Sequence, residues 1–165
     1  MKRRIFLTHS TSALGLSLLA QNATAQDLND QQKATTIQIK LTSVVVDDQQ
    51  KALKFYTEIL GFMKKQDVDL GMGPIRWITL VSPHDQDGTE LALEPAGFPA
   101  AKTFQEAIFK MGVPYTAFAV SDIHKEYDRL TALAVKFRVK PTKMGEQMIA
   151  HFEDTCGNVI QLFQV

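Results

Sequence analysis

The sequence LTSVVVDDQQKALKFYTEILGF, residues 41–62, carries the strongest structural signal in the chain. Three consecutive valines at 44–46 predict a strand, since β-branched side chains favour extended backbone. The strand is expected to end at Asp47 and Asp48, either of which can accept hydrogen bonds from the first N–H groups of a helix. Apolar residues then recur at helical spacing up to Gly61, which fits the position just past a helix end. Residues 41–62 therefore predict a strand followed at once by an amphipathic helix.

The composition is that of one ordinary globular domain. The chain has 165 residues, of which 45% are hydrophobic and 22% are charged, and this balance argues against disorder. The formal net charge is zero, so the chain carries no excess of positive charge for binding nucleic acid. Cys156 is the only cysteine, which excludes an intramolecular disulfide.

Residues 1–25 resemble an export signal rather than a part of the fold. A basic start at residues 2–4 precedes a short apolar run at 13–20, and small residues at 23–25 fit a cleavage site. The start reads RRIFL, which resembles the twin-arginine export motif. The apolar run is too short to span a bilayer comfortably. We therefore expect cleavage after Ala25, no stable membrane span in the mature protein, and a location in the periplasm or outside the cell.

Two similar units are expected after a polar, flexible leader at residues 26–36. The first unit covers about residues 37–95. Its strands after the first helix are expected at 62–69, 75–81 and 89–94. A linker helix follows at about residues 100–112, where Phe104, Ile108 and Met111 share one face. The second unit covers about residues 113–165.

The second unit repeats the pattern of the first. Residues 115–122 (YTAFAVSD) can be laid on residues 41–48 (LTSVVVDD), which places Asp122 on Asp48, and a second helix is expected to start from a cap at Asp122 or Ser121. Apolar residues follow Asp122 at helical spacing, namely Ile123, Tyr127, Leu130 and Ala134. Further strands are expected at 137–139, 147–152 and 159–165. The chain is therefore expected to contain two β-α-β-β-β units in tandem, within a single domain.

Matching positions in both units carry a family resemblance. In the first unit they are Val46, Asp48, Phe55, Tyr56, Leu60, Gly61, Phe62, Thr89, Glu90 and Leu91. In the second unit they are Phe118, Val120, Asp122, Asp154, Gly157, Asn158, Ile160, Gln161 and Leu162. Over residues 37–165 the chain thus resembles the vicinal oxygen chelate superfamily of glyoxalases, bleomycin-resistance proteins and extradiol dioxygenases. The resemblance implies an α+β fold whose modules form a half-open mixed β-barrel with helices outside, and it implies a homodimer.

Strand alternation predicts which side chains face the cavity that the resemblance implies, because successive residues of a strand point to opposite faces. The expected cavity-facing residues are Leu41, Ser43, Val45, Glu90, Ala92, Glu94, Tyr115, Ala117, Ala119, Gln161 and Phe163. Glu90 and Glu94 lie on the same face of their strand, so the sequence leaves open which of them belongs to a site.

The resemblance also implies where a metal would bind. In the metal-using members one residue from each of four strands holds the cation, and those positions are Leu41, Glu90, Tyr115 and Gln161 in this chain. Leucine has no donor atom, a phenol is an uncommon ligand and an amide oxygen is a weak one. We therefore expect a largely lost metal site and no cofactor. A divalent metal held by Glu90 and Gln161 is the alternative.

Three other side chains are candidates for a site. Arg76 and Trp77 alternate on their strand, so one of them faces the cavity, and Arg76 there could pair with Glu90 or bind an anionic ligand. His151 lies in a predicted strand. It could act as a general base or as an alternative metal ligand, or it could be an ordinary half-buried histidine.

The functional hypothesis is an exported protein, similar to bleomycin-resistance proteins, that binds a small, partly apolar molecule in the cavity. The expected ligand-binding residues are Leu41, Arg76, Trp77, Glu94, Tyr115, His151, Gln161 and Phe163. The alternative is a metal-dependent lyase or isomerase similar to lactoylglutathione lyase, or a dioxygenase, with Glu90 as the catalytic residue. A third reading is a scaffold whose barrel is filled by its own side chains. Whether the protein is an enzyme stays open at this point.

Overall fold

The structure, a computed structural model, describes residues 37–165. The predicted export signal (residues 1–25) and the predicted leader (residues 26–36) lie outside this range. Residues 39–165 form one folded unit. Within the described part of the chain, no helix is long and apolar enough to cross a membrane.

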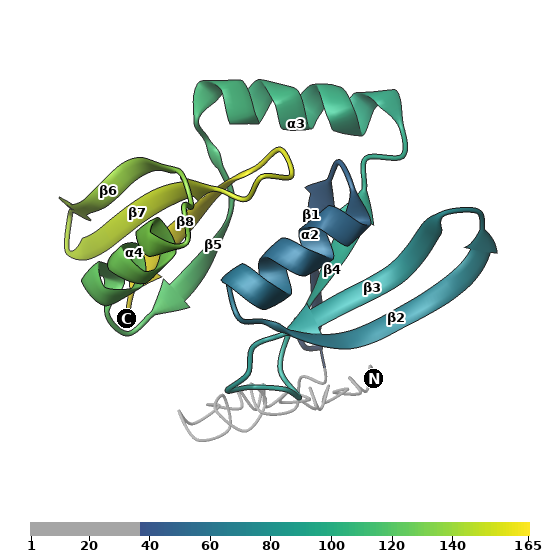
Figure 1. Ribbon diagram of the computed structural model, residues 1–165, viewed down its shortest axis with the longest axis horizontal. Coiled ribbons are helices and arrows are strands. Elements are labelled where there is room, and N and C mark those ends of the chain that lie inside the picture. Colours follow the sequence, from purple (N-terminus) through teal and green to yellow (C-terminus); the bar gives the residue numbers. More distant parts are fainter. Residues whose placement is uncertain (1–36) are drawn as a thin grey trace, which may run out of the picture. The chain divides into compact units, whose positions relative to one another are not determined.

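The first unit consists of a four-stranded sheet and one helical segment (Figure 1). Its strands are β1 (Leu41–Val46), β2 (Met63–Met72), β3 (Ile75–Val81) and β4 (Glu90–Pro95). Helix α2 (Gln49–Lys54) and the π-helical turn η1 (Phe55–Ile59) connect β1 to β2. The strands are arranged β1-β4-β3-β2, with β1 parallel to β4 and the other pairs antiparallel.

The second unit has the same topology and follows helix α3 (Pro99–Met111). Its strands are β5 (Pro114–Val120), β6 (Phe137–Met144), β7 (Gln147–Glu153) and β8 (Val159–Gln164), and helix α4 (Ile123–Ala132) follows β5. The strand order β5-β8-β7-β6 reproduces that of the first sheet, with β5 parallel to β8. The structure therefore confirms the α+β fold of two β-α-β-β-β units in mixed sheets.

The two units begin their helices in the same way. The carboxylate of Asp48 accepts hydrogen bonds from the backbone N–H groups of Gln50 and Lys51, at 2.8 and 3.0 Å. Asp122 does the same for the two residues after Ile123, at 3.1 and 3.0 Å. Asp48, and not Asp47, is therefore the cap of α2, because it satisfies N–H groups that have no partner inside the helix.

The apolar core fills the helix-bearing side of both sheets. Val44 and Val46 of β1 are fully buried, as are Leu130 of α4 and Ile160 of β8, and they belong to one continuous cluster that includes both units. Tyr56 joins the units through its ring, whose edge meets the ring of Phe118. Because the cluster is shared, neither unit completes its core alone.

A buried polar network ties the units together at what we call the seam, the contact of β1, η1 and α3 with the turn at residues 154–158. Asp154 accepts hydrogen bonds from the Tyr56 hydroxyl at 2.9 Å, from the Asn158 amide at 2.7 Å, and from the backbone N–H groups of Cys156 and Asn158 at 2.8 and 2.9 Å. The Asn158 amide also donates to the Val45 carbonyl at 2.8 Å. Each buried polar group here has a partner, which is what burial requires.

Helix α3 does not pack against the rest of the protein through the apolar face that its sequence predicts. Phe104 and Met111 are 56% and 76% exposed, whereas the Gln105 side chain is almost completely buried. The Gln105 amide lies at the seam, where it donates to the carbonyls of Val45 and Cys156 at 2.8 and 3.1 Å. The helix therefore packs through a polar anchor, a contact that apolar spacing does not predict.

Ala134 adopts a left-handed backbone conformation (φ 61°) just after α4, a region that favours glycine. Replacing Ala134 with glycine is expected to raise the free energy of unfolding by about 0.5–1 kcal/mol, because the strained conformation costs an L-residue roughly that much. Urea denaturation of the purified protein measures the change. In the matched control Ala132→Gly, at the end of α4, the same substitution should lower stability instead, by about 0.5–1 kcal/mol. Equal effects of the two changes would contradict the strain argument.

Candidate functional site

The helix-free face of the first sheet carries most of the predicted site residues from the first unit. Leu41 lies opposite Glu90, and Val45 lies opposite Glu94, in the parallel pairing of β1 with β4. Trp77 shares this face, because it alternates with Thr79, whose hydroxyl bonds to Glu90. The structure thus places Leu41, Trp77, Glu90 and Glu94 on one surface.

Glu90 is held by its neighbours on that face. Its carboxylate accepts hydrogen bonds from the hydroxyl of Thr79 at 2.6 Å and from the amide of Gln66 at 3.2 Å, and it pairs with the ammonium group of Lys65 at 3.4 Å. The Thr79 hydrogen bond, followed by those from Lys65 and Gln66, holds the pKa of Glu90 below its ordinary value of 4.5. Glu90 is therefore an ionised carboxylate whose oxygens are already bound by neighbouring side chains.

Replacing Glu90 with glutamine is expected to lower the free energy of unfolding by about 1 kcal/mol at neutral pH, since a charge-assisted hydrogen bond becomes a neutral one. The folded carboxyl binds its proton less tightly than the unfolded one does. Its stabilisation is therefore present above the ordinary pKa of 4.5 and is lost as the pH falls through the lower folded value. Urea denaturation between pH 3 and pH 7 should show the difference between the two proteins shrinking below pH 4.5. A difference that grows on acidification would contradict this account.

Glu90 and Glu94 cannot serve one metal ion together. They lie four positions apart on β4, which corresponds to about 13 Å along a strand. Oxygen and nitrogen ligands must lie within about 2.5 Å of a divalent cation. The register therefore gives each carboxylate a separate place on the sheet.

Arg76 lies on the opposite, helix-bearing face. Its guanidinium bonds to the side chain of Asp67 and pairs with Asp69 at 3.9 Å. Of the two possibilities that the sequence left open, β3 points Trp77 rather than Arg76 toward the face that carries Glu90, so Arg76 does not pair with Glu90. Hydrogen bonding to Asp67 raises the pKa of Arg76, and hydrogen bonds from Lys64 and then from Arg76 lower the pKa of Asp67.

The second sheet brings together three predicted residues on its helix-free face. His151 of β7 lies opposite Gln161 of β8, and its Nε2 atom is 3.0 Å from the Gln161 side-chain oxygen. Phe163 lies on the same face, two residues beyond Gln161. Tyr115 is half-buried, and its ring meets the exposed ring of Phe104 on α3.

The four positions that hold a metal in related enzymes do not form a fitting donor set in this chain. Leu41 offers no donor atom, Glu90 is bound by three side chains, and the Gln161 oxygen already contacts His151. Within residues 37–165, no group of three or more His, Cys, Asp and Glu side chains is arranged to hold a metal ion. The chemistry of these donors therefore does not match that of a divalent transition-metal site.

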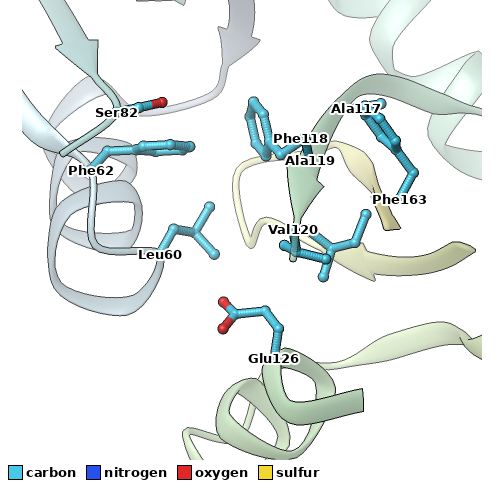
Figure 2. A pocket seen from close by; sticks show the side chains of 10 residues that line it. Leu60, Phe62, Ser82, Ala117, Phe118, Ala119, Val120, Glu126 and Phe163 are labelled. Carbon is cyan, nitrogen blue, oxygen red and sulfur yellow. The ribbon is translucent and has the colours of Figure 1, made fainter. Parts of the chain in front are cut away.

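A groove lies between the two units, along β5 (Figure 2). Leu60, Phe62 and Ser82 form one wall, and the consecutive residues 117–120 form the other. Its volume is about 390 Å³, which is within the range of small-molecule sites. A smaller recess of about 180 Å³ shares Phe62 with it and continues between the units. We call the larger space the β5 groove.

One end of the β5 groove carries a negative charge that is neutralised by an ion pair. Glu126 of α4 points into it from below in Figure 2 and is bound by Arg129, whose Nε donates at 2.9 Å. Arg129 also donates to the Ile59 carbonyl at 2.9 Å, which links α4 to the end of the first helical segment. The groove thus combines apolar walls with a neutralised ion pair.

Among the residues that line this groove, strand alternation in the sequence pointed to Ala117, Ala119 and Phe163 as cavity-facing residues. Leu60 and Phe62 are visible in the sequence as members of the F-Y-x-x-x-L-G-F pattern, yet nothing in that pattern shows that they face a groove. Their position depends on how the two units pack against each other, which strand alternation does not report. Cys156, by contrast, is fully buried in its turn, where burial raises the pKa of the thiol to about 12 and makes it unreactive.

The fold and these faces define the class, a protein of paired β-α-β-β-β modules. Residues 38–162 match the sequence profile described as the Glyoxalase/Bleomycin resistance protein/Dioxygenase superfamily. The chain belongs to this superfamily, in agreement with the resemblance seen in its motifs.

Three similar proteins illustrate the range of the family. Uncharacterized protein YurT of Bacillus subtilis (strain 168) is 60% identical over 128 residues, which cover 78% of this chain and 99% of YurT. The crystal structure of UcmS2 shares 28% identity with a TM-score of 0.67, covering 78% of this chain and 98% of UcmS2. TnmS3, an antibiotic binding protein from Streptomyces sp. CB03234, shares 27% identity with a TM-score of 0.62, covering 79% of this chain and 98% of TnmS3.

Proposed function

We propose that the protein binds a small, partly apolar molecule. The observation that carries this proposal is the β5 groove, whose volume of about 390 Å³ and apolar walls suit a ligand of drug-like size. The structural likeness to TnmS3, which is named as an antibiotic binding protein, supports the same class of function. The unsuitable donor set at Leu41, Glu90, Tyr115 and Gln161 supports binding without a metal.

The proposal includes export and self-association. The twin-arginine-like start and the cleavage site support a mature protein in the periplasm or outside the cell, and the family match begins only at residue 38. A homodimer is supported by the exposed apolar side chains on the helix-free face of the first sheet. Leu41, Met63, Val68 and Met72 are 43–58% exposed there, and a second copy would cover such a face.

A thermal-shift screen of the purified protein tests the binding function. A ligand present at 100 times its Kd is expected to raise Tm by about 5–10 °C, because binding to the folded state alone adds about 2.7 kcal/mol to its stability. The screen should combine planar aromatic, aliphatic and short peptide compounds with salts of zinc, nickel, iron and manganese. The proposal fails if no organic compound raises Tm.

Elemental analysis of the same preparation separates binding from metal-dependent catalysis. We expect no stoichiometric metal and no change in Tm on treatment with a chelator. Stoichiometric zinc, nickel, iron or manganese that depends on Glu90 would overturn the proposal in favour of a lyase, isomerase or dioxygenase. Glu90→Gln is the variant for this comparison, since it keeps the shape of the side chain and removes its charge.

A further inference from the structure

The β5 groove runs along the edge of a sheet rather than across its face. Strand β5 is one of the two edge strands of the order β5-β8-β7-β6. Four consecutive residues, 117–120, line the groove. Successive side chains of a strand point to opposite faces, so consecutive residues can line one wall only if that wall is the strand's edge. Figure 2 shows this wall facing Leu60 and Phe62.

Among the residues that the structure describes, the backbone groups on that edge have no hydrogen-bond partner. The Val120 carbonyl accepts a hydrogen bond from the N–H group of Val165 at 3.0 Å, so it points toward β8. Alternation along the strand then points the N–H and C=O groups of Ala117 and Ala119 the other way, into the groove. Within residues 37–165, no backbone or side-chain group bonds to these outward groups. Both alanines are exposed, and their small side chains leave room for close approach.

The rest of the groove suits an uncharged, apolar chain. Leu60 and Phe62 face the edge from the other wall. At the charged end, the carboxylate of Glu126 is paired with Arg129, so the lining presents no unbalanced charge to a ligand. A ligand with backbone amides and apolar side chains therefore complements both the edge and the wall.

We propose that the β5 groove binds an extended, uncharged peptide or peptide-like amide, which adds to the second sheet as a strand beside β5. This inference rests on the proposed function and names the class of its ligand. The ligand's backbone exchanges hydrogen bonds with Ala117 and Ala119, and its alternate side chains lie against Leu60, Phe62 and Phe163. Four residues of β5 line the groove, so a segment of about three to five residues, roughly 13 Å long, fits it.

A blocked pentapeptide provides the probe, namely acetyl-Val-Phe-Val-Leu-Val-amide, with binding measured by calorimetry. Two further versions carry N-methyl groups, one at the odd and one at the even residues. Only one of these sets can point its N–H groups at β5, because the N–H groups of a strand alternate in direction. We expect one version to bind at least about fivefold more weakly for each bond removed and the other to bind nearly as well as the parent. Equal binding of all three would overturn strand addition.

The matching protein variant is Ala119→Pro. It removes the outward N–H group of β5 and leaves the hydrogen bonds to β8 in place, since proline is tolerated on the free edge of a sheet. We expect binding of the parent peptide to weaken about fivefold or more. The control is Ser43→Pro on β1, the edge strand of the first sheet. The backbone groups of Ser43 point away from β4, as do those of Val45, whose carbonyl accepts hydrogen bonds from the side chains of Gln105 and Asn158. The control should bind the peptide like the wild type.

The outcomes separate this inference from the proposed function. If non-peptide compounds raise Tm while the blocked peptide does not bind, the inference fails and the binding function stands; if nothing binds, both fail. If the protein is a dimer that Ala119→Pro dissociates while the peptide has no effect, the edge belongs to a second copy and the inference fails. Should Ala119→Pro not fold, as judged by circular dichroism, the N-methyl series decides alone.

Discussion

Replacing Asp154 with alanine is expected to lower the free energy of unfolding by about 3–5 kcal/mol. Its carboxylate accepts four hydrogen bonds at the seam, from the side chains of Tyr56 and Asn158 and from the backbone of Cys156 and Asn158. Alanine would leave these donors buried and unpaired, and each such group costs about 1–3 kcal/mol unless water reaches it. Urea denaturation followed by the fluorescence of Trp77, the single tryptophan, measures the loss.

Two further variants establish that the effect comes from the network. Tyr56→Phe removes one donor and leaves the carboxylate with three, so a smaller loss of about 1–2 kcal/mol is expected. Asp128→Ala removes an exposed carboxylate of α4 and should change stability by less than about 0.5 kcal/mol. If Asp154→Ala were no worse than Asp128→Ala, the network would contribute nothing to the seam.

Replacing Gly157 with alanine is expected to lower the free energy of unfolding by about 2–4 kcal/mol. Gly157 adopts a φ of +95°, which costs an L-residue about 1–2 kcal/mol. An added Cβ would also lie 2.9 Å from the Gln105 amide nitrogen, which is anchored at the seam by its hydrogen bonds to the carbonyls of Val45 and Cys156. Displacing the Gln105 amide adds about 1–3 kcal/mol to the loss of stability, the range found when a larger side chain is forced into a packed core.

Gly61→Ala is the matched control for this change. Gly61 has a similar φ of +82°, but no atom lies within 4 Å of the added Cβ. Only the backbone cost of about 1–2 kcal/mol should therefore appear. Thermal or urea denaturation of both variants measures the difference in their free energy of unfolding. Equal losses of stability would show that the Gln105 side chain moves away from the added Cβ at no energetic cost.

The parts of the fold that depend on neighbouring residues could be predicted from the sequence. The helix starts close to Asp48 and Asp122 and the helix end at Gly61 follow from the preferences of single residues for particular backbone geometries. Alternation likewise placed Val44 and Val46 in the core. The repeat of these signals along the chain was sufficient to predict both units.

The parts that depend on how the units meet could not be predicted. Gln105 reads as a polar residue on an amphipathic helix, and its burial is decided by carbonyl groups of β1 and of the 154–158 turn. The faces of Arg76 and Trp77 also stayed open, because both side chains have an apolar and a polar part. The β5 groove was missed for the same reason, since it forms between Phe62 of one unit and Ala117 of the other.

The seam also has a consequence for the order of events during translation. The hydrogen bond from Asn158 to Val45 joins residues 113 positions apart, and that from Tyr56 to Asp154 joins residues 98 positions apart. Contacts of such high sequence separation form late, because a long loop must close before they are made. Asp154 and Asn158 are synthesised only after the whole of the first unit. The first unit therefore leaves the ribosome with its half of the core uncovered, and the domain completes its fold only after the turn at residues 154–158 has followed.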